Sequence, residues 1–234
     1  MDWIVDLVER VMGLLPGLWV SLQLTAGAVA AGIPLGFLAG LALQRRNRWI
    51  TWPIIGLVEI FRGFPALLTL YLVYFGLAGF YPLDAFTSVV IAFGLTTGAY
   101  SSEIFRTAIA SVPRGQLEAA DALGLTSWQR LRTVVLPHVL TIAVPPVIGI
   151  VIISFQGSAL AYAIGMKELL GSAFSQGMLN FTLIPELLVA AGLYLAVTLA
   201  LSGMESLAAR RARRIAGRGP VAATKNLAAT ATAA

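Results

Sequence analysis

Five long stretches without Asp, Glu, Lys or Arg dominate this sequence, and they restrict it to a narrow set of folds. A membrane-spanning helix needs about 20 mainly apolar residues. Only 12% of the 234 residues are charged, whereas soluble domains carry about 25%. The pattern predicts an all-α membrane protein. The charge-free stretches are residues 11–44, 63–83, 85–102, 133–166 and 187–204.

Five transmembrane helices follow from these stretches once each is extended to full length. The segment 159–183 is also apolar, but glycine and polar residues interrupt it, and we expect a short helix and a loop outside the membrane there. Asp2, Asp6 and Glu9 precede the first span, so we expect no cleaved signal peptide, which needs a basic start. The expected spans are 16–43, 52–77, 86–109, 138–158 and 184–206.

Basic residues set the expected orientation, because loops rich in Lys and Arg stay in the cytoplasm. Thirteen of the sixteen Lys and Arg residues follow the first, third and fifth spans or, as Arg106 does, lie at the edge of the third. The N-terminus is therefore expected outside and the C-terminus inside the cell. We expect one membrane domain, residues 1–210, and a basic to disordered cytoplasmic tail, residues 211–234. The charge follows topology, which argues against nucleic-acid binding.

The loop at residues 111–136 has the pattern of two short helices joined at a glycine. Ser111 is a candidate N-cap, and Pro113 suits a first helical turn. Gly124 suits a left-handed helix stop, and Thr126 with Gln129 forms a capping-box pattern for a second helix. From periodicity alone, a connector helix lying on the lipid surface is the alternative.

The loop carries Glu118-Ala119-Ala120, then Gly124 six residues after the Glu, then Leu136-Pro137. This register resembles the signature loop of permease subunits of ATP-binding-cassette (ABC) importers. The resemblance implies a type I importer permease fold, in which the loop docks on a separate ATPase subunit. The expected coupling residues are Glu118, Ala119, Ala120, Gly124, Leu136 and Pro137.

Two further blocks are informative, namely Val58 to Pro65 and Gly98 to Arg106. They are similar to motifs of polar amino-acid permeases such as those for histidine and glutamine. This resemblance implies an importer for polar amino acids or their analogues in the bacterial cytoplasmic membrane, with a second permease subunit, two ATPases and an external substrate-binding protein. The chain has no Gly-x-x-x-x-Gly-Lys-Ser/Thr loop, so we expect no enzyme activity in it, with ATP and Mg on the partner ATPase.

Charged pairs inside the expected spans form a second set of candidates. Glu59 with Arg62 and Glu103 with Arg106 are each three residues apart, so each pair shares a helix face. Charged residues within spans are functional candidates by default. The alternatives are a structural pair near the cytosolic end, or a lock between two permease subunits.

Three polar residues are candidates for the substrate path, namely Tyr100, Gln156 and Ser158, because a polar solute needs polar groups facing an internal cavity. Gln156-Gly157 stands where the resembled family usually has Lys-Asp, which weakens the case for a cationic amino acid. With no cysteine and one histidine, no metal site is expected. His138, beside Leu136-Pro137, is expected to be structural.

Two other classes of protein remain as alternatives to an amino-acid importer. An ion-driven secondary transporter would be built from inverted repeats, into which five spans do not divide. A membrane-embedded enzyme would need converging catalytic groups, which the sequence does not show. An ABC importer for a non-amino-acid solute is also left open, as are the amino acid itself and the pairing of permease subunits.

Overall fold

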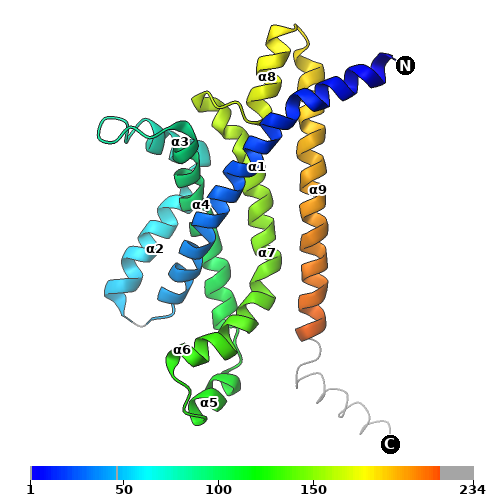
Figure 1. Ribbon diagram of the computed structural model, residues 1–234. Coiled ribbons are helices and arrows are strands. Elements are labelled where there is room, and N and C mark those ends of the chain that lie inside the picture. The colour runs from blue at the N-terminus through cyan, green and yellow to red at the C-terminus, as the bar shows by residue number, and fades with distance from the viewer. Residues whose placement is uncertain (1, 46, 217–234) are drawn as a thin grey trace, which may run out of the picture.

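The computed structural model describes residues 2–45 and 47–216, and these form helices joined by short turns (Figure 1). The first residues of the tail expected over 211–234 belong to α9, which continues to Ala216. The rest of that tail, residues 217–234, lies outside the described residues. The elements are α1 (Asp2–Ala42), α2 (Arg48–Gly63), α3 (Ala66–Tyr74), α4 (Ala85–Ala110), α5 (Arg114–Ala122), α6 (Ser127–Arg130), the π-helical segment η1 (Leu131–Val135), α7 (Leu136–Gly157), the 3₁₀ segment η2 (Ser158–Ile164), α8 (Leu169–Leu179) and α9 (Leu183–Ala216).

Three continuous helical stretches in the described residues are long and apolar enough to cross a membrane, namely 3–42, 127–164 and 183–214. The pair α2 and α3 can make a fourth span if the bent pair counts as one. The remaining expected span, 86–109, is α4, which is rich in Ser, Thr and Gly. It has 26 residues, or about 39 Å of helix. The count of five therefore stays a prediction.

The core of the molecule is the long crossing of α1 over α4 (Figure 1). Small residues on both helices let the backbones approach closely. A Cβ added at Gly32 would lie 2.6 Å from the carbonyl oxygen of Gly94, which is closer than real side chains come. In membranes, such small-residue contacts replace the hydrophobic drive between helices, because lipid is as apolar as leucine. Leu24, Ala28, Leu70, Val89 and Phe93 extend this core toward α3.

The expected single helix over 52–77 is wrong, because α2 and α3 meet at a bend of 107°. Phe64 has an extended backbone (φ −80°, ψ 136°), which is the conformation that a following proline favours. Pro65 then precedes the first residue of α3. The break brings the C-terminal end of α2 next to α4, where the Arg62 carbonyl accepts a hydrogen bond from Tyr100.

Helix α8 and the turns around it confirm the short helix and loop expected over 159–183 (Figure 1). The carboxylate of Glu168 caps α8 by accepting the backbone N–H groups of Leu170 and Gly171. It also accepts hydrogen bonds from Ser21 on α1 and Tyr194 on α9, at 3.3 and 2.9 Å. Burial raises the pKa of Glu168, while these hydrogen bonds oppose that rise. One buried carboxylate thus joins three helices.

The loop over 111–136 folds into a compact projection at the end of the molecule opposite the N-terminus (Figure 1). We call residues 112–135 the knob. The capping box of Thr126 and Gln129 is present as predicted. Two expectations are wrong. Ser111 is the C-cap of α4, and Pro113 is the N-cap of α5.

The second knob helix is expected to end before the next span, and this expectation is wrong. Residues 127–164 form one continuous helical stretch through η1. Pro137, which has no N–H to donate to the preceding turn, is the second residue of α7, and α7 directly follows the π-helical segment. The π-helical segment is a break in regular geometry of the kind often found at functional sites. It joins the knob directly to α7.

Candidate functional site

A cavity of about 470 Å³ lies between α3, α4 and α7, on an open side of the bundle. Most of its walls are apolar, with a few hydroxyl and amide groups between them. Pockets for small molecules typically combine apolar walls with a few placed polar groups. Its lining residues are Phe64, Ala66, Phe93, Thr96, Thr97, Tyr100, Ile150, Ile153, Ser154, Gln156, Gly157 and Leu160.

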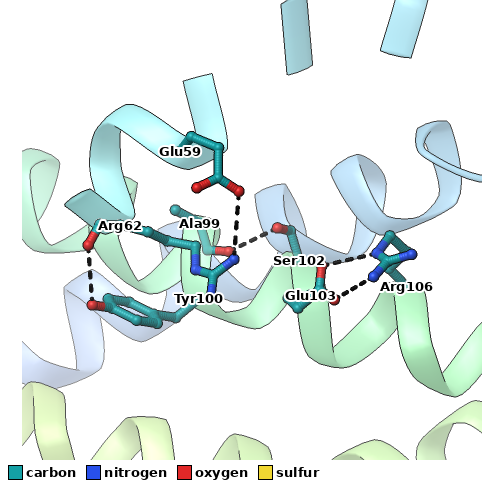
Figure 2. A network of polar contacts seen from close by, with 7 residues as sticks. All are labelled: Glu59, Arg62, Ala99, Tyr100, Ser102, Glu103 and Arg106. Atoms are coloured by element: carbon teal, nitrogen blue, oxygen red, sulfur yellow. Dashed lines mark hydrogen bonds and ion pairs between the residues drawn. The ribbon is translucent and has the colours of Figure 1, made fainter. Parts of the chain in front are cut away.

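Tyr100 lies at this cavity and also holds the broken span in place (Figure 2). Its hydroxyl donates a hydrogen bond of 3.3 Å to the carbonyl oxygen of Arg62, just before the bend. The guanidinium carbon of Arg62 lies 5.7 Å from the centre of the Tyr100 ring, within range of a cation–π contact. Tyr100 therefore connects the cavity wall to the end of α2.

Gln156 and Ser158 occupy different environments. Gln156 lines the cavity, and its amide donates a long hydrogen bond of 3.4 Å to Thr198 on α9. Ser158 is fully buried, does not line the cavity, and donates to the carbonyl oxygen of Phe155. Three further polar residues, which the sequence did not single out, do line it, namely Thr96, Thr97 and Ser154. The hydroxyls of Thr97 and Ser154 lie 3.0 Å apart and join α4 to α7.

The two charged pairs lie close together on α2 and α4 (Figure 2). Arg62 Nη1 is 3.8 Å from Glu59 Oε1, and Arg106 Nε donates a 2.8 Å bond to Glu103. Arg62 is a half-exposed residue whose buried Nε has no hydrogen-bond partner among the described residues. Both pairs form as the spacing predicts. Whether they serve function or structure stays a prediction.

The knob presents an exposed surface that carries two large apolar side chains. Leu123 is 78% exposed and Trp128 is 68% exposed. Gly124 between α5 and α6 has a φ of +69°, and Leu125 N–H bonds back to the Ala120 carbonyl, which is a glycine-dependent helix stop. Arg130 on α6 bonds to Asp121 on α5 at 2.7 Å, so the two helices form one unit.

The expected coupling residues divide between this surface and the interior of the knob. Glu118 and Ala119 are exposed, whereas Ala120 is 3% exposed. Leu136 and Pro137 begin α7 directly above the knob. In the residues that the structure describes, no three His, Cys, Asp or Glu side chains come together in a way that could hold a metal ion.

The comparisons with known proteins agree with this architecture. Residues 32–214 match the family model described as binding-protein-dependent transport system inner membrane component. The chain is 32% identical over 191 residues to the probable amino-acid ABC transporter permease YckA of Bacillus subtilis, covering 81% of this chain and 84% of that protein. It is 31% identical over 221 residues to the glutamate/aspartate import permease GltK of Escherichia coli, covering 90% and 97%.

Solved structures show the same fold. A chain from the crystal structure of an amino acid ABC transporter with histidines superposes with a TM-score of 0.79 at 30% identity, covering 88% of this chain and 97% of that chain. A chain from an inward-facing MetNI methionine ABC transporter superposes with a TM-score of 0.68 at 20% identity, covering 84% and 96%. At that identity, the second match supports the fold alone.

Proposed function

This chain belongs to the family of binding-protein-dependent transport system inner membrane components, and we propose that it is the permease subunit of an ATP-driven importer for polar amino acids or close analogues. It forms the translocation pathway and couples it to a separate ATPase. The relatives named as amino-acid permeases, at about one-third identity over most of the chain, support this substrate class.

The pathway runs along the cavity beside Tyr100 and Gln156. This cavity is open on one side, and a second permease subunit, the same chain or a related one, closes it. None of its lining residues carries a charge at neutral pH. A neutral or zwitterionic solute fits such walls better than a cationic one. The alternative is an ABC importer for a non-amino-acid solute of similar size.

The single observation that carries the coupling proposal is the knob with its exposed Leu123 and Trp128. Exposed large apolar side chains beside a compact turn mark a protein interface more than a solvated loop. A partner ATPase that receives these side chains would move the knob when it closes on ATP and Mg. Because α6, η1 and α7 are continuous, that movement reaches the cavity wall formed by Ile150, Ile153 and Ser154.

The positions of the basic residues support an orientation for this assembly. The knob, the α1–α2 turn and the C-terminal end of α9 lie at one end of the molecule (Figure 1). Arg45, Arg114, Arg132 and Arg210 belong to these segments. This end faces the cytoplasm, where the ATPase is. The other end, with α8 and the N-terminus of α1, faces the external binding protein.

Reconstitution tests this proposal directly. The chain, its second permease subunit and its ATPase are placed in liposomes with the external binding protein. We expect ATP hydrolysis that rises when the loaded binding protein is added, with uptake of a labelled amino acid. Uptake driven by an ion gradient without ATP would establish the ion-driven alternative. A complex that hydrolyses ATP but responds to no amino acid would change the substrate class.

A further inference from the structure

The two charged pairs on α2 and α4 place four charged side chains at the surface of the bundle, at a depth where lipid is expected. Glu59, Arg62, Glu103 and Arg106 all fall inside the expected spans, and we call them the charged face (Figure 2). The Glu59 side chain is 67% exposed and the Arg106 side chain 47%. Charged residues within spans are costly and almost always face a protein interior or a water-filled cavity. Something other than lipid therefore covers the charged face.

The internal pairing of the charged face leaves bonding capacity unused. Arg106 donates a hydrogen bond to Glu103 on the same helix. Arg62 Nη1 lies 3.8 Å from Glu59 Oε1, which is longer than a hydrogen bond. A guanidinium has five N–H donors and a carboxylate accepts several hydrogen bonds. These exposed groups can therefore take further partners of opposite charge.

The charged face continues the wall of the cavity toward the knob. Thr96 and Tyr100 line the cavity, and Glu103 follows them on the same face of α4, because residues three and four apart are neighbours on a helix surface. Thr107 comes next along this face and is exposed. Helix α4 then ends at Ala110, just before the knob. A partner that closes the open side of the cavity also lies against the charged face.

The balance of charge on this face suits a second copy of the chain. The face holds two carboxylates and two guanidiniums, in two pairs of the same order. In a twofold-symmetric interface the same patch meets itself, so that residue i contacts residue j and j contacts i. Glu103 of one copy can then meet Arg106 of the other, and the reverse contact forms at the same time. A patch of one sign would repel its own copy.

We propose that the charged face is the contact surface for a second copy of this chain, and that this contact closes the end of the cavity nearest the knob. The inference rests on the proposed function, because it identifies the second permease subunit that completes the pathway. The Glu103 and Arg106 side chains of the two copies pair across the symmetry axis as well as within each helix.

Opposite charge reversals in two differently tagged copies test this contact. One copy carries Glu103→Arg, which gives it two basic side chains on α4, and the other carries Arg106→Glu, which gives it two acidic ones. Neither copy keeps its own pair on α4, so only a mixed dimer brings opposite charges together there. The copies are expressed together with the ATPase, and the dimers are counted by native mass spectrometry. We expect mixed dimers to exceed like dimers several-fold, whereas two tagged wild-type copies should pair at random.

Random pairing of the two charge-reversed copies would overturn the inference, because it would show that the pairs act only within their own helices. Wild-type copies that never pair would overturn it as well, in favour of a related permease chain. Neither result touches the importer proposal, which stands or falls with ATP-driven uptake in liposomes. A charge-selective dimer that gives no ATP-driven uptake would instead overturn the proposed function.

Cysteine crosslinking locates the contact without changing its charges. Thr107→Cys places the only cysteine of the chain one turn beyond Glu103. A short bis-maleimide should link two copies in the nucleotide-free state, the ATP-trapped state or both. Leu199→Cys, exposed on α9 at the other side of the bundle from α2 (Figure 1), is the control and should link in neither. Absence of a link at position 107 in both states would overturn the contact, and its reaction with a water-soluble maleimide would then show that water covers the charged face.

Discussion

Ser111 and His138 share a hydrogen bond of 3.2 Å between Oγ and Nε2, and this contact joins the two ends of the knob. Ser111 is the C-cap of α4, and His138 lies in the first turn of α7. The same serine hydroxyl lies 2.7 Å from the carbonyl oxygen of Ala108. Under the proposed coupling, we therefore expect movement of the knob to be passed to α4 and α7 together rather than to α7 alone.

Removing this contact should loosen coupling without unfolding the protein. An exposed hydrogen bond contributes about 1 kcal/mol, so His138→Ala should lower the number of substrate molecules moved per ATP several-fold and leave basal hydrolysis intact. His138→Gln, whose amide can still reach Ser111, is the control and should retain most of the coupling. Uptake and hydrolysis measured in the same liposomes give this ratio. Equal ratios in both variants would assign His138 to packing alone.

Gly124 is the position in the knob where a side chain is least tolerated. Its φ of +69° is strained for a β-branched residue, at about 1–3 kcal/mol. Gly124→Val should therefore reduce binding of the ATPase or substrate-stimulated hydrolysis at least several-fold. Gly115→Val is the matched control, because that glycine lies in α5 without a positive φ and its Cβ meets nothing within 4 Å. Normal coupling in Gly124→Val would rule out the knob as the ATPase contact.

The sequence predicted the helices well, because apolar runs of about 20 residues have few other folds available. It did not predict the bend at Phe64-Pro65. The apolar run continues through the bend, and hydropathy alone does not indicate a change in the direction of the helix axis. It also placed a helix start at Leu136-Pro137, where the structure has a continuous helix. Proline in a first turn looks the same in sequence whether a preceding helix stops or runs on.

The candidate site shows the same limits at the level of single residues. Tyr100 and Gln156 stood out as large polar groups in apolar runs, and both line the cavity. Thr97 and Ser154 did not stand out, because small hydroxyls in membrane helices commonly bond to their own backbone. Ser158 does so. Glu168 is contacted by Ser21, more than 140 residues before it on α1, and by Tyr194, 26 residues after it on α9. A local sequence pattern cannot predict such long-range contacts.

Glu168 should be the most important single polar group for the stability of the end of the bundle that carries α8. Glu168→Ala leaves the N–H groups of Leu170 and Gly171 and the hydroxyl of Tyr194 without their acceptor. Each unmet buried group costs about 1–3 kcal/mol, so the midpoint of thermal unfolding in detergent should fall markedly. Tyr194→Phe removes one of these donors and should cost about a third as much or less. An unchanged midpoint in Glu168→Ala would contradict this role.

The expected orientation can be checked with single cysteines, since the chain contains none of its own. Asp84 precedes α4, and position 230 lies in the segment outside the described residues. A cysteine at position 84 should react with a membrane-impermeant maleimide in intact cells, and one at position 230 only after lysis. Both positions reacting in intact cells would contradict an odd number of spans.

Two substitutions of Tyr100 can distinguish a structural role of its hydroxyl from a transport role of its ring. Tyr100→Phe loses the hydrogen bond to the Arg62 carbonyl but keeps the ring beside the guanidinium and the cavity. Tyr100→Ala loses both. If the ring shapes the pathway, Tyr100→Phe should change apparent substrate affinity by no more than about tenfold, for a bond of about 1 kcal/mol, while Tyr100→Ala should lower uptake and broaden specificity further. Gln156→Ala should act in the same direction through a different wall of the cavity. Concentration-dependent uptake with basal ATP hydrolysis as the control distinguishes these outcomes, and unchanged kinetics in Tyr100→Ala and Gln156→Ala would place the substrate contacts on the second permease subunit.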